Sequence, residues 1–495
     1  MIVAGPNVPI ESQSDLLVRL SFDTPGSLGP LSALRYDRVL LHEFEAGQQV
    51  PAAILRDIFS RQITSIRRLV GAGAEISYRP FAHLKDRPSA LVVFPGSPIP
   101  LDKGSNQRVF NLVYHLNTQG IATELLITTS RSSALPRLAD LLTAIAPRVH
   151  TYRNNKPFLP WRLRTRREVE RLLRLRSGQL RSAPDLFADR LATRASLDGC
   201  KKLSALVETG LYDTVIVNFA WMTGLLDAAK GSSPNAARWL CDTHDVQFLR
   251  GASLDRKELR WRVSQEEQKA LELKALRKYD AVIAISQGDD SNLREQLGDK
   301  SVILAPSGFD YAQTEVSELA DPLAPSFGFI GRAMQANQLA LEKLLLDWWP
   351  SIQKVAPRSR LLVAGSICAN SRMKSLLSES KNTEALGFVP TLGSFYSKID
   401  VALNPVVVQG GLNFKSVEAV AAGCLLVTTP MGVRSLGEGA PVVVASSGKE
   451  VASALRDLMA DPSTMRAQRE QAQLWCTSNF GDEVAFRNLR GIVGG

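Results

Sequence analysis

The feature that most constrains the fold is a regular alternation of short β-rich runs with amphipathic helical stretches. Parallel strands need a crossover connection, usually a helix, so this alternation is typical of parallel sheets covered by helices. The sequence therefore predicts an α/β protein. The expected strands form two series, ALVVFPG, ATELLITT, DTVIVNF, ARWLCDTHD, DAVIAIS and VILAPSG, followed by FGFIGR, RLLVAGS, TEALGFV, DVALNPV, CLLVTTP and PVVVASS.

The two series predict two separate domains. A chain of 495 residues is too long for one hydrophobic core. We expect two Rossmann-like, doubly wound domains at 89–306 and 307–495, which face one another across a central cleft. Ligands of such sheets bind at the carboxyl ends of the strands, so the cleft is the expected binding site.

Residues 1–88 fit this scheme less well and predict an extra βαβ-like segment. RYDRVLLHEF reads as a strand, residues 51–73 as one helix and AEISYRP as a second strand. The pattern does not show whether this N-terminal extension continues the first sheet or forms a module of its own.

Composition favours a soluble globular protein, because 45% of the residues are hydrophobic and 22% are charged. No apolar run has the length of a membrane span, and the short apolar start has no basic flank typical of a secretory signal. We therefore expect a cytoplasmic protein. Neither a disulfide framework nor a zinc site is expected, because the cysteines are scattered without a C-x-x-C pair: Cys200, Cys241, Cys368, Cys424 and Cys476.

A net charge of +10 and a pI near 9.4 indicate an anionic partner. Many of the cations gather in residues 153–194, where leucines at helical spacing make the stretch amphipathic. A solvated helix face and an anionic membrane surface explain this pattern equally well. Nucleic acid is a weaker explanation, because no aromatic ladder accompanies the charge. The membrane alternative predicts peripheral association with the inner membrane face.

Residues 406–429, VVVQGGLNFKSVEAVAAGCLLVTT, contain a possible phosphate site. Glycine lets backbone N–H groups approach an anion closely, and a helix expected over 416–422 would direct its positive N-terminal end to the same place. An ordinary loop between a strand and a helix remains the alternative for the pair Gly410 and Gly411 alone.

Several strings, taken in order, resemble one enzyme family. VVFPGSPIPLDKGSNQRVFNLVYHLNTQG, LCDTHDVQFLR, YDAVIAISQGDDSNL, FGFIGRAMQANQLAL and the segment ending QGGLNFKSVEAVAAGCLLVTT are similar to nucleotide-sugar-dependent glycosyltransferases of the GT-B fold, in particular family 4. The resemblance covers roughly residues 89–490. It implies a retaining, metal-independent glycosyltransferase of the hexosyltransferase type, without a cofactor. A nucleoside-diphosphate-sugar would be the donor and a glycan or lipid-linked molecule the acceptor.

The resemblance also implies roles for individual residues. His244 would lie beside the reacting sugar, and Arg332 and Lys415 would be the cations on the diphosphate. Glu418 would accept hydrogen bonds from the ribose hydroxyls. Further donor-binding positions are Gly104, at the start of a helix in the first domain, Phe388 and Val389 beside the base, and the backbone of Gly410, Gly411, Leu412, Asn413 and Phe414. No metal ligands are expected.

One departure from the family pattern keeps other functions open. Many members have a glutamate eight positions before the one that matches Glu418, and Gly410 stands there in this chain. A non-catalytic module that binds a nucleotide or glycan is therefore an alternative, as is a nucleotide-sugar epimerase of the same architecture. The string NFGDEVAFRNLRGIV resembles the family's final helix, which crosses back to the first domain.

Overall fold

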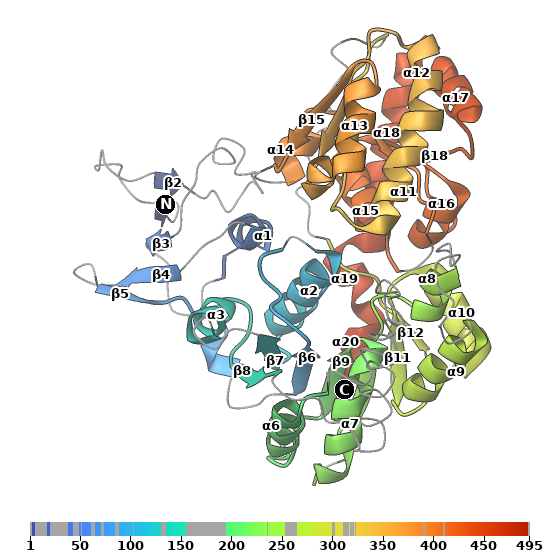
Figure 1. The fold of residues 1–495 in the computed structure, drawn as a ribbon. Coiled ribbons are helices and arrows are strands. Elements are labelled where there is room, and N and C mark those ends of the chain that lie inside the picture. The colour runs from blue at the N-terminus through green and yellow to red at the C-terminus, as the bar shows by residue number, and fades with distance from the viewer. Residues whose placement is uncertain are drawn as a thin grey trace, which may run out of the picture.

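The chain forms two lobes joined at a narrow junction, with an N-terminal sheet beside the first lobe (Figure 1). The computed structural model describes residues 2–4, 17–19, 38–42, 49–50, 52–60, 65–70, 74–84, 89–101, 103–129, 135–154, 195–234, 236–252, 265–298, 302–309, 316, 321, 323–389, 392–408 and 411–493.

The first lobe is built on a seven-stranded parallel sheet, in the order β12-β11-β10-β9-β6-β7-β8. Its strands are β6 Ala90–Phe94, β7 Thr123–Thr129, β8 Val149–Arg153, β9 Thr214–Asn218, β10 Arg238–Asp242, β11 Ala281–Ala284 and β12 Val302–Leu304. Its helices are α2 Gly104–Thr118, α3 Leu135–Leu142, α6 Leu197–Val207, α7 Thr223–Ala229, α8 Gln247–Ala252, α9 Gln265–Leu276 and α10 Gln287–Leu297.

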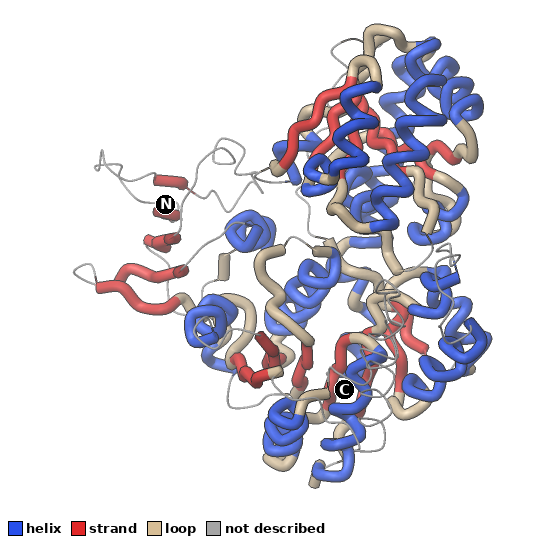
Figure 2. Tube along the Cα trace, viewed as in Figure 1, coloured by secondary structure: helices blue, strands red, loops and turns tan. Residues whose placement is uncertain are grey.

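The second lobe is built on a six-stranded parallel sheet, in the order β15-β14-β13-β16-β17-β18. Its strands are β13 Phe327–Ile330, β14 Leu361–Ala364, β15 Thr383–Gly387, β16 Val401–Asn404, β17 Leu425–Thr428 and β18 Val443–Val444. Helices surround the sheet (Figure 2), namely α11 Gln335–Lys343, α12 Trp349–Val355, α13 Ser371–Glu379, α14 Leu392–Tyr396, α15 Phe414–Ala421, α16 Pro430–Leu436, α17 Gly448–Ala460 and α18 Pro462–Phe480.

These sheets confirm the predicted α/β class with two doubly wound domains. Every expected strand of both series is present, and β8 is the strand of the first sheet that was not predicted. In each sheet, successive strands are added first toward one edge and then toward the other. The strand order reverses between β6 and β9 in the first sheet and between β13 and β16 in the second. Such switch points are where open α/β sheets bind ligands.

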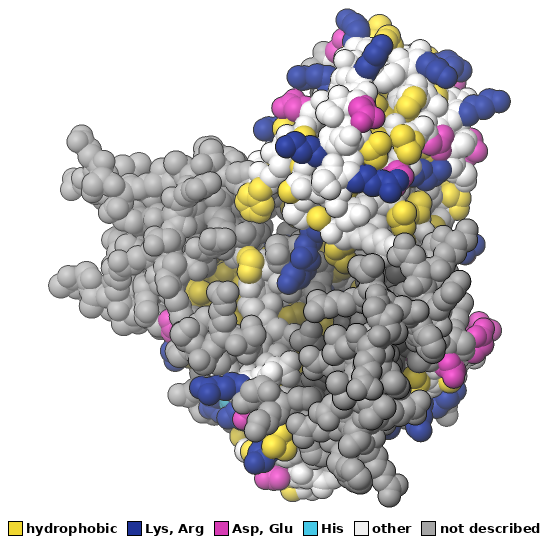
Figure 3. Space-filling model, in the orientation of Figure 1, with side chains coloured by type: hydrophobic (Ala, Val, Ile, Leu, Met, Phe, Trp, Pro, Cys, Tyr) yellow, Lys and Arg dark blue, Asp and Glu magenta, His cyan; other side chains and the backbone are white. Residues whose placement is uncertain are grey.

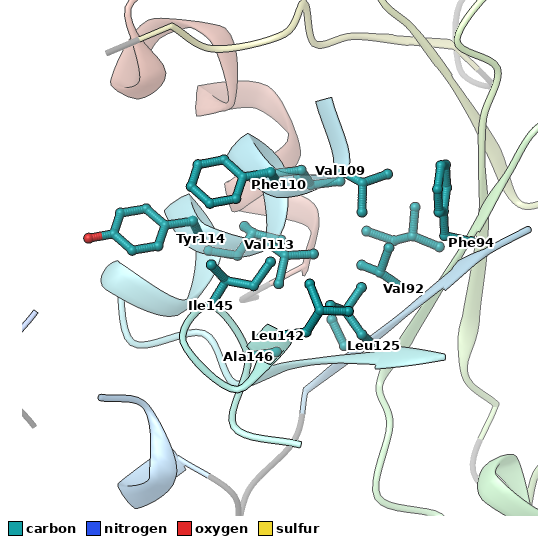
Figure 4. Packing of buried hydrophobic residues seen from close by; sticks show 14 of the residues in the cluster. Val92, Phe94, Val109, Phe110, Val113, Tyr114, Leu125, Leu142, Ile145 and Ala146 are labelled. Atoms are coloured by element: carbon teal, nitrogen blue, oxygen red, sulfur yellow. The ribbon is translucent and has the colours of Figure 1, made fainter. Parts of the chain in front are cut away.

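One of the two buried clusters of the first lobe forms around α2 (Figure 4). Val109, Phe110 and Val113 of α2 lie in one buried cluster with Val92 of β6 and Leu125 of β7. The run GSNQRVFNLVYHLNT supplies this face because its apolar residues recur at helical spacing. The packing fixes the first turn of α2 at the carboxyl end of β6.

The last helices return to the first lobe. α19 Asp482–Ala485 and α20 Arg487–Val493 follow α18, and Phe486, Leu489 and Val493 belong to the same buried cluster as α2. The predicted crossing of the final helix is therefore confirmed.

The N-terminal extension contains a βαβ unit, as predicted, but its second strand is not the predicted AEISYRP. β3 Arg38–His42 pairs in parallel with β4 Ser65–Val70, and α1 Ala52–Ser60 lies between them in the sequence. The prediction of one helix over 51–73 was wrong, because Ser65–Val70 pairs on both sides within a sheet. That sheet has the order β2-β1-β3-β4-β5, with β1 Ile2–Ala4, β2 Leu17–Arg19 and β5 Ala74–Ser77.

Helix α1 is part of the first lobe's core rather than of a separate one. Leu55, Ile58 and Phe59 are buried in the cluster formed around α2. The rings of Phe59 and Phe110 meet edge to face, with centroids 5.7 Å apart. The extension is therefore anchored on α2 through its helix.

Helix α1 also reaches the two places where the chain crosses between the lobes. Arg56 Nε donates to Asn111 Oδ1 at 2.9 Å, and Arg56 Nη2 lies 3.4 Å from Asp482 Oδ2. Asn111 donates in turn to the carbonyl oxygen of Gly308, on the first crossing. The second crossing ends at Asp482. Arg56 therefore contacts the second crossing directly and the first crossing through Asn111.

The basic residues 153–194 lie almost wholly outside the described residues. On the face shown in Figure 3, the described cations of the second lobe are interspersed with acidic side chains. Within the described part of the chain, no helix combines the length and apolar character needed to cross a membrane.

We expect Arg56→Met to lower the free energy of unfolding by about 1–2 kcal/mol, because it removes the hydrogen bonds from Arg56 to Asn111 and Asp482 at a largely buried junction. Urea denaturation measures this change. Arg79→Met is the matched control, since the Arg79–Asp140 pair is more exposed and a surface pair contributes about 0–1 kcal/mol. Equal effects of the two substitutions would contradict a role of Arg56 at the junction.

Candidate functional site

The segment 411–418 of the second lobe docks against the first lobe. Gly411 N donates to Asp289 Oδ2 at 3.1 Å, and a Cβ on Gly411 would lie 2.5 Å from the carbonyl oxygen of His244. Phe414 covers the start of α2, since a Cβ on Gly104 would lie 2.8 Å from its ring. The carboxyl edges of the two sheets therefore meet at this segment.

Glycine is therefore required for steric reasons at Gly104 and Gly411, where a Cβ would collide with neighbouring atoms. Gly411 has a φ of +62°, a conformation that side chains with a Cβ rarely adopt. Gly104 begins α2 directly beneath the ring of Phe414. The structure brings both predicted glycines together at the junction, while Gly410 lies outside the described residues.

Lys415 lies on the first turn of α15, which begins at Phe414, two residues earlier than predicted. Its Nζ donates to Asn337 Oδ1 at 2.8 Å and stands 5.0 Å from the centroid of the Phe329 ring. Burial lowers the pKa of Lys415 to about 8, and the nearby Glu418 carboxylate partly offsets this effect. The amine is therefore cationic at neutral pH but close to its midpoint.

Glu418 is buried, with 3% of its surface exposed. Tyr396 OH donates to its Oε2 at 3.3 Å, and the side chain of Gln107, on the first turn of α2, also hydrogen-bonds the carboxylate. Burial raises the pKa of Glu418, and Gln107, Tyr396 and Lys415 act in the opposite direction. One partner of this carboxylate thus comes from the other lobe.

The predicted backbone donors divide into two groups. Gly411 N donates to Asp289, and Phe414 N donates to Leu412 O at 3.1 Å. Among the described residues, the N–H groups of Leu412 and Asn413 have no acceptor. Asn413 Oδ1 accepts from Asn404 at the end of β16, which places these two N–H groups beside the second switch point.

Arg332 follows β13 at the same switch point and is exposed. Its carbonyl oxygen accepts a hydrogen bond from Asn337 Nδ2 at 2.9 Å. Asn337, which the sequence analysis missed, therefore joins the segment of Arg332 to the amine of Lys415. The available signal was its position in the first turn of a helix that directly follows a core strand.

His244 occupies the first lobe's side of the junction, just beyond β10. Its Nε2 lies 2.7 Å from Asn218 Oδ1 at the end of β9, and its ring stacks on Phe219 with centroids 4.2 Å apart. Both Phe219 and His244 have a positive φ, of 71° and 59°. Such backbone strain is uncommon and concentrates at functional sites. Asn218 was also missed, although a polar residue ended an apolar strand.

Burial lowers the pKa of His244 to about 4. Asp242 and Asp245 act to raise this pKa, whereas Arg108 acts to lower it. The imidazole is therefore neutral at physiological pH, which suits a hydrogen-bonding role better than that of a charged group.

Phe388 and Val389 follow β15, at the end of the second sheet distant from β18. Phe388 is 81% exposed, and Gly387 before it has a φ of +65°. Val389 packs against the buried cluster that contains Leu412 and Val417 of segment 411–418, whereas the exposed ring of Phe388 is not part of that cluster.

Buried carboxyl groups also line the junction. Glu272 accepts from the backbone N–H groups of Gln247 and Phe248, and burial raises its pKa to about 8. Burial likewise raises the pKa of Asp289 to about 7, and the charge of Asp245 adds to this effect. Both side chains bind backbone groups, which indicates a structural role.

Residues 324–461 match the family model described as Glycosyl transferases group 1. Most of the second lobe is therefore similar to this glycosyltransferase family. The match includes β13, Lys415 and Glu418. No curated protein matches the chain.

Solved structures show that the whole arrangement is a GT-B fold. Sucrose-phosphate synthase from Thermosynechococcus elongatus is 15% identical, with a TM-score of 0.58, over 82% of this chain and 98% of that one. Anabaena HepE in complex with UDP and glucose is 13% identical, with a TM-score of 0.55, over 82% of this chain and 99% of that one. TarM from S. aureus is 9% identical, with a TM-score of 0.57, over 83% of this chain and 100% of that one. The predicted GT-B architecture is confirmed.

We expect Gly411→Ala to separate the lobes, because a Cβ 2.5 Å from a backbone carbonyl leaves no room for the docked loop. Small-angle scattering should show a larger radius of gyration. Gly439→Ala is the matched control, since Gly439 also has a positive φ, +77°, but has nothing within 4 Å of the added atom. The Gly439 variant should lose only about 1–2 kcal/mol of folding stability, the cost of a positive φ in a residue with a Cβ. If both variants keep the wild-type radius, the 411–418 contact does not hold the lobes together.

Proposed function

We propose that this GT-B protein transfers a sugar from a nucleoside-diphosphate-sugar to a glycan or lipid-linked acceptor, with retention of configuration and without a metal. The observation that carries this proposal is the group of Lys415, Asn337 and Glu418 at the second switch point, within the residues that match the glycosyltransferase family. It is the hexosyltransferase type of activity that the sequence resemblance implied.

The residues have complementary tasks in this proposal. Lys415 and Arg332 supply positive charge to the diphosphate, together with the N–H groups of Leu412 and Asn413. Glu418 accepts hydrogen bonds from two ribose hydroxyls, for which a carboxylate has enough lone pairs. The sugar then points across the junction toward His244. Charge stabilisation on the departing diphosphate is the main contribution to catalysis, and the two cations take the part that a metal has in other transferases.

Support for the donor class comes from the fold relatives. HepE has been solved with UDP and glucose, and TarM has been solved with UDP and alpha-GlcNAc-glycerol. This chain shares their fold at low identity, so the base and sugar are left to experiment. For the acceptor, the basic residues 153–194 support a substrate at an anionic membrane, with the protein cytoplasmic and peripheral.

The alternatives receive less support. An epimerase requires acidic catalytic residues facing the sugar, but Glu272 and Asp289 at the junction bind backbone N–H groups. A non-catalytic binding module is motivated by Gly410 in place of a glutamate. Thermal stabilisation by UDP-, GDP- and ADP-sugars, followed by nucleotide release with and without acceptors, separates the three. Donor binding without release or product would favour the binding module.

Glu418→Gln should weaken donor binding or turnover by roughly tenfold to more than a hundredfold, because a lost charge-assisted hydrogen bond costs about 1.5–3 kcal/mol. Titration calorimetry and nucleotide release measure the two effects. Glu124→Gln is the matched control: Glu124 is equally buried but lies at the amino end of β7, bonded to Tyr212 and His150. A Glu418 variant that binds and turns over every donor normally would remove this residue from the site.

Nucleoside-diphosphate affinity should fall as the pH rises through about 8, because the lowered pKa of Lys415 makes its amine neutral above that value. Bound diphosphate favours the ammonium form, so binding should take up protons in this range. Lys415→Arg is the control, since a guanidinium stays charged and should flatten the profile. The measurement is Kd for UDP, GDP and ADP between pH 6.5 and 9.5. Identical profiles for both proteins would place Lys415 away from the phosphates.

A further inference from the structure

The amide of Asn218 has one possible orientation. Asn218 Nδ2 lies 2.9 Å from the carbonyl oxygen of Val93, which can only accept a hydrogen bond. The nitrogen must therefore face Val93 on the neighbouring strand β6, and Oδ1 must face His244. Since Oδ1 cannot donate, the 2.7 Å contact requires a proton on His244 Nε2.

This proton fixes the state of the second ring nitrogen. A neutral imidazole carries one N–H, so a proton on Nε2 leaves Nδ1 as an acceptor. The charged groups that act on the ring are Asp242 at the end of β10, Asp245 in the following loop and Arg108 on α2. With burial, their combined effect keeps the ring neutral at physiological pH.

Two consecutive residues hold this ring. Asn218 binds its edge, and Phe219 stacks on its face with an interplanar angle of 21°. The positive φ of Phe219 turns the chain so that both contacts are made at the end of β9. Edge and face contacts together define the plane of the imidazole as well as its tautomer.

We propose that Asn218 is a positioning residue that holds His244 with Nδ1 as the hydrogen-bond acceptor, so that the ring can receive a substrate hydroxyl. The proposal rests on the proposed function for the identity of that hydroxyl, which belongs to the transferred sugar. The ring binds as a neutral acceptor and takes no proton in the reaction. A protonated ring would present N–H at both nitrogens and could not accept.

Nitrogen NMR of ring-labelled histidine tests the tautomer without any substrate. The chain has five histidines, and the spectrum of His244→Gln identifies the signals of this one. In the wild type we expect a protonated Nε2 and an unprotonated Nδ1 at pH 7. Asn218→Leu should give a mixture of both tautomers. Asn218→Asp should keep the tautomer and raise the pKa of His244, because a carboxylate would then face Nε2.

Kinetics test whether the tautomer matters for turnover. Asn218→Leu should lower kcat about threefold to tenfold with a smaller change in KM, as expected for one lost neutral hydrogen bond. Asn218→Asp should retain kcat at alkaline pH. On acidification, its kcat should fall at a higher pH than that of the wild type. Asn117→Asp is the matched control, because this buried amide binds the carbonyls of Val113, Thr123 and Ile145 instead. In the Asn117 variant, the pH at which kcat falls on acidification should be the same as in the wild type.

Each outcome decides the matter. A wild-type ring protonated at Nδ1, or an unchanged tautomer in Asn218→Leu, would overturn the inference. An acid limb of Asn218→Asp that stays in place while NMR shows a raised pKa would also overturn it. If no donor is turned over by the wild type, the proposed function fails, whereas the NMR result still decides whether Asn218 sets the tautomer.

Discussion

A fully buried ion pair between Arg108 and Asp242 underlies the first lobe's half of the site. Arg108 Nε lies 2.9 and 2.7 Å from the two carboxylate oxygens, and neither side chain is exposed. Removing one partner of such a pair typically costs about 3–5 kcal/mol, because the other is left as a buried charge. The pair joins α2 to the end of β10. It therefore fixes the helix turn that carries Gln107 relative to the loop that carries His244.

The positions of most strands along the chain were predictable because they follow from local sequence. Strands buried on both faces read as continuous apolar runs, and this holds for β6, β9 and β14. β8 escaped prediction because VHTYR is an edge strand of mixed polarity. The wrong helix over 51–73 has a different cause. Ser65–Val70 becomes a strand through its pairing with β3 and β5, and tertiary contacts of this kind override local preference.

The site was predictable where a residue type has a chemical reason to stand at a strand end. His244 and Arg332 were predicted at strand ends, whereas Lys415 and Glu418 were predicted from the family resemblance. The structure places Lys415 and Glu418 on one helix turn. Their partners could not be found, because each partnership joins distant segments. Asn337 lies 78 residues from Lys415 and Asn218 lies 26 from His244. A single sequence carries no signal for these contacts beyond a polar residue beside a core strand.

The contacts of segment 411–418 have a consequence for how binding and lobe movement are related. Gly411 N–H donates to Asp289, and the Glu418 carboxylate accepts from Gln107, so groups next to the proposed donor site contact the first lobe. A ligand that hydrogen-bonds to both oxygens of Glu418 must displace Gln107 from the carboxylate. A ligand that leaves the Gln107–Glu418 hydrogen bond intact would bind while the lobes are joined. Ligand affinity and the distance between the lobes must then depend on each other, because coupling between two equilibria is reciprocal. Arg56 contacts one crossing between the lobes directly and the other through Asn111. The N-terminal extension thereby acts on the same equilibrium from outside the site.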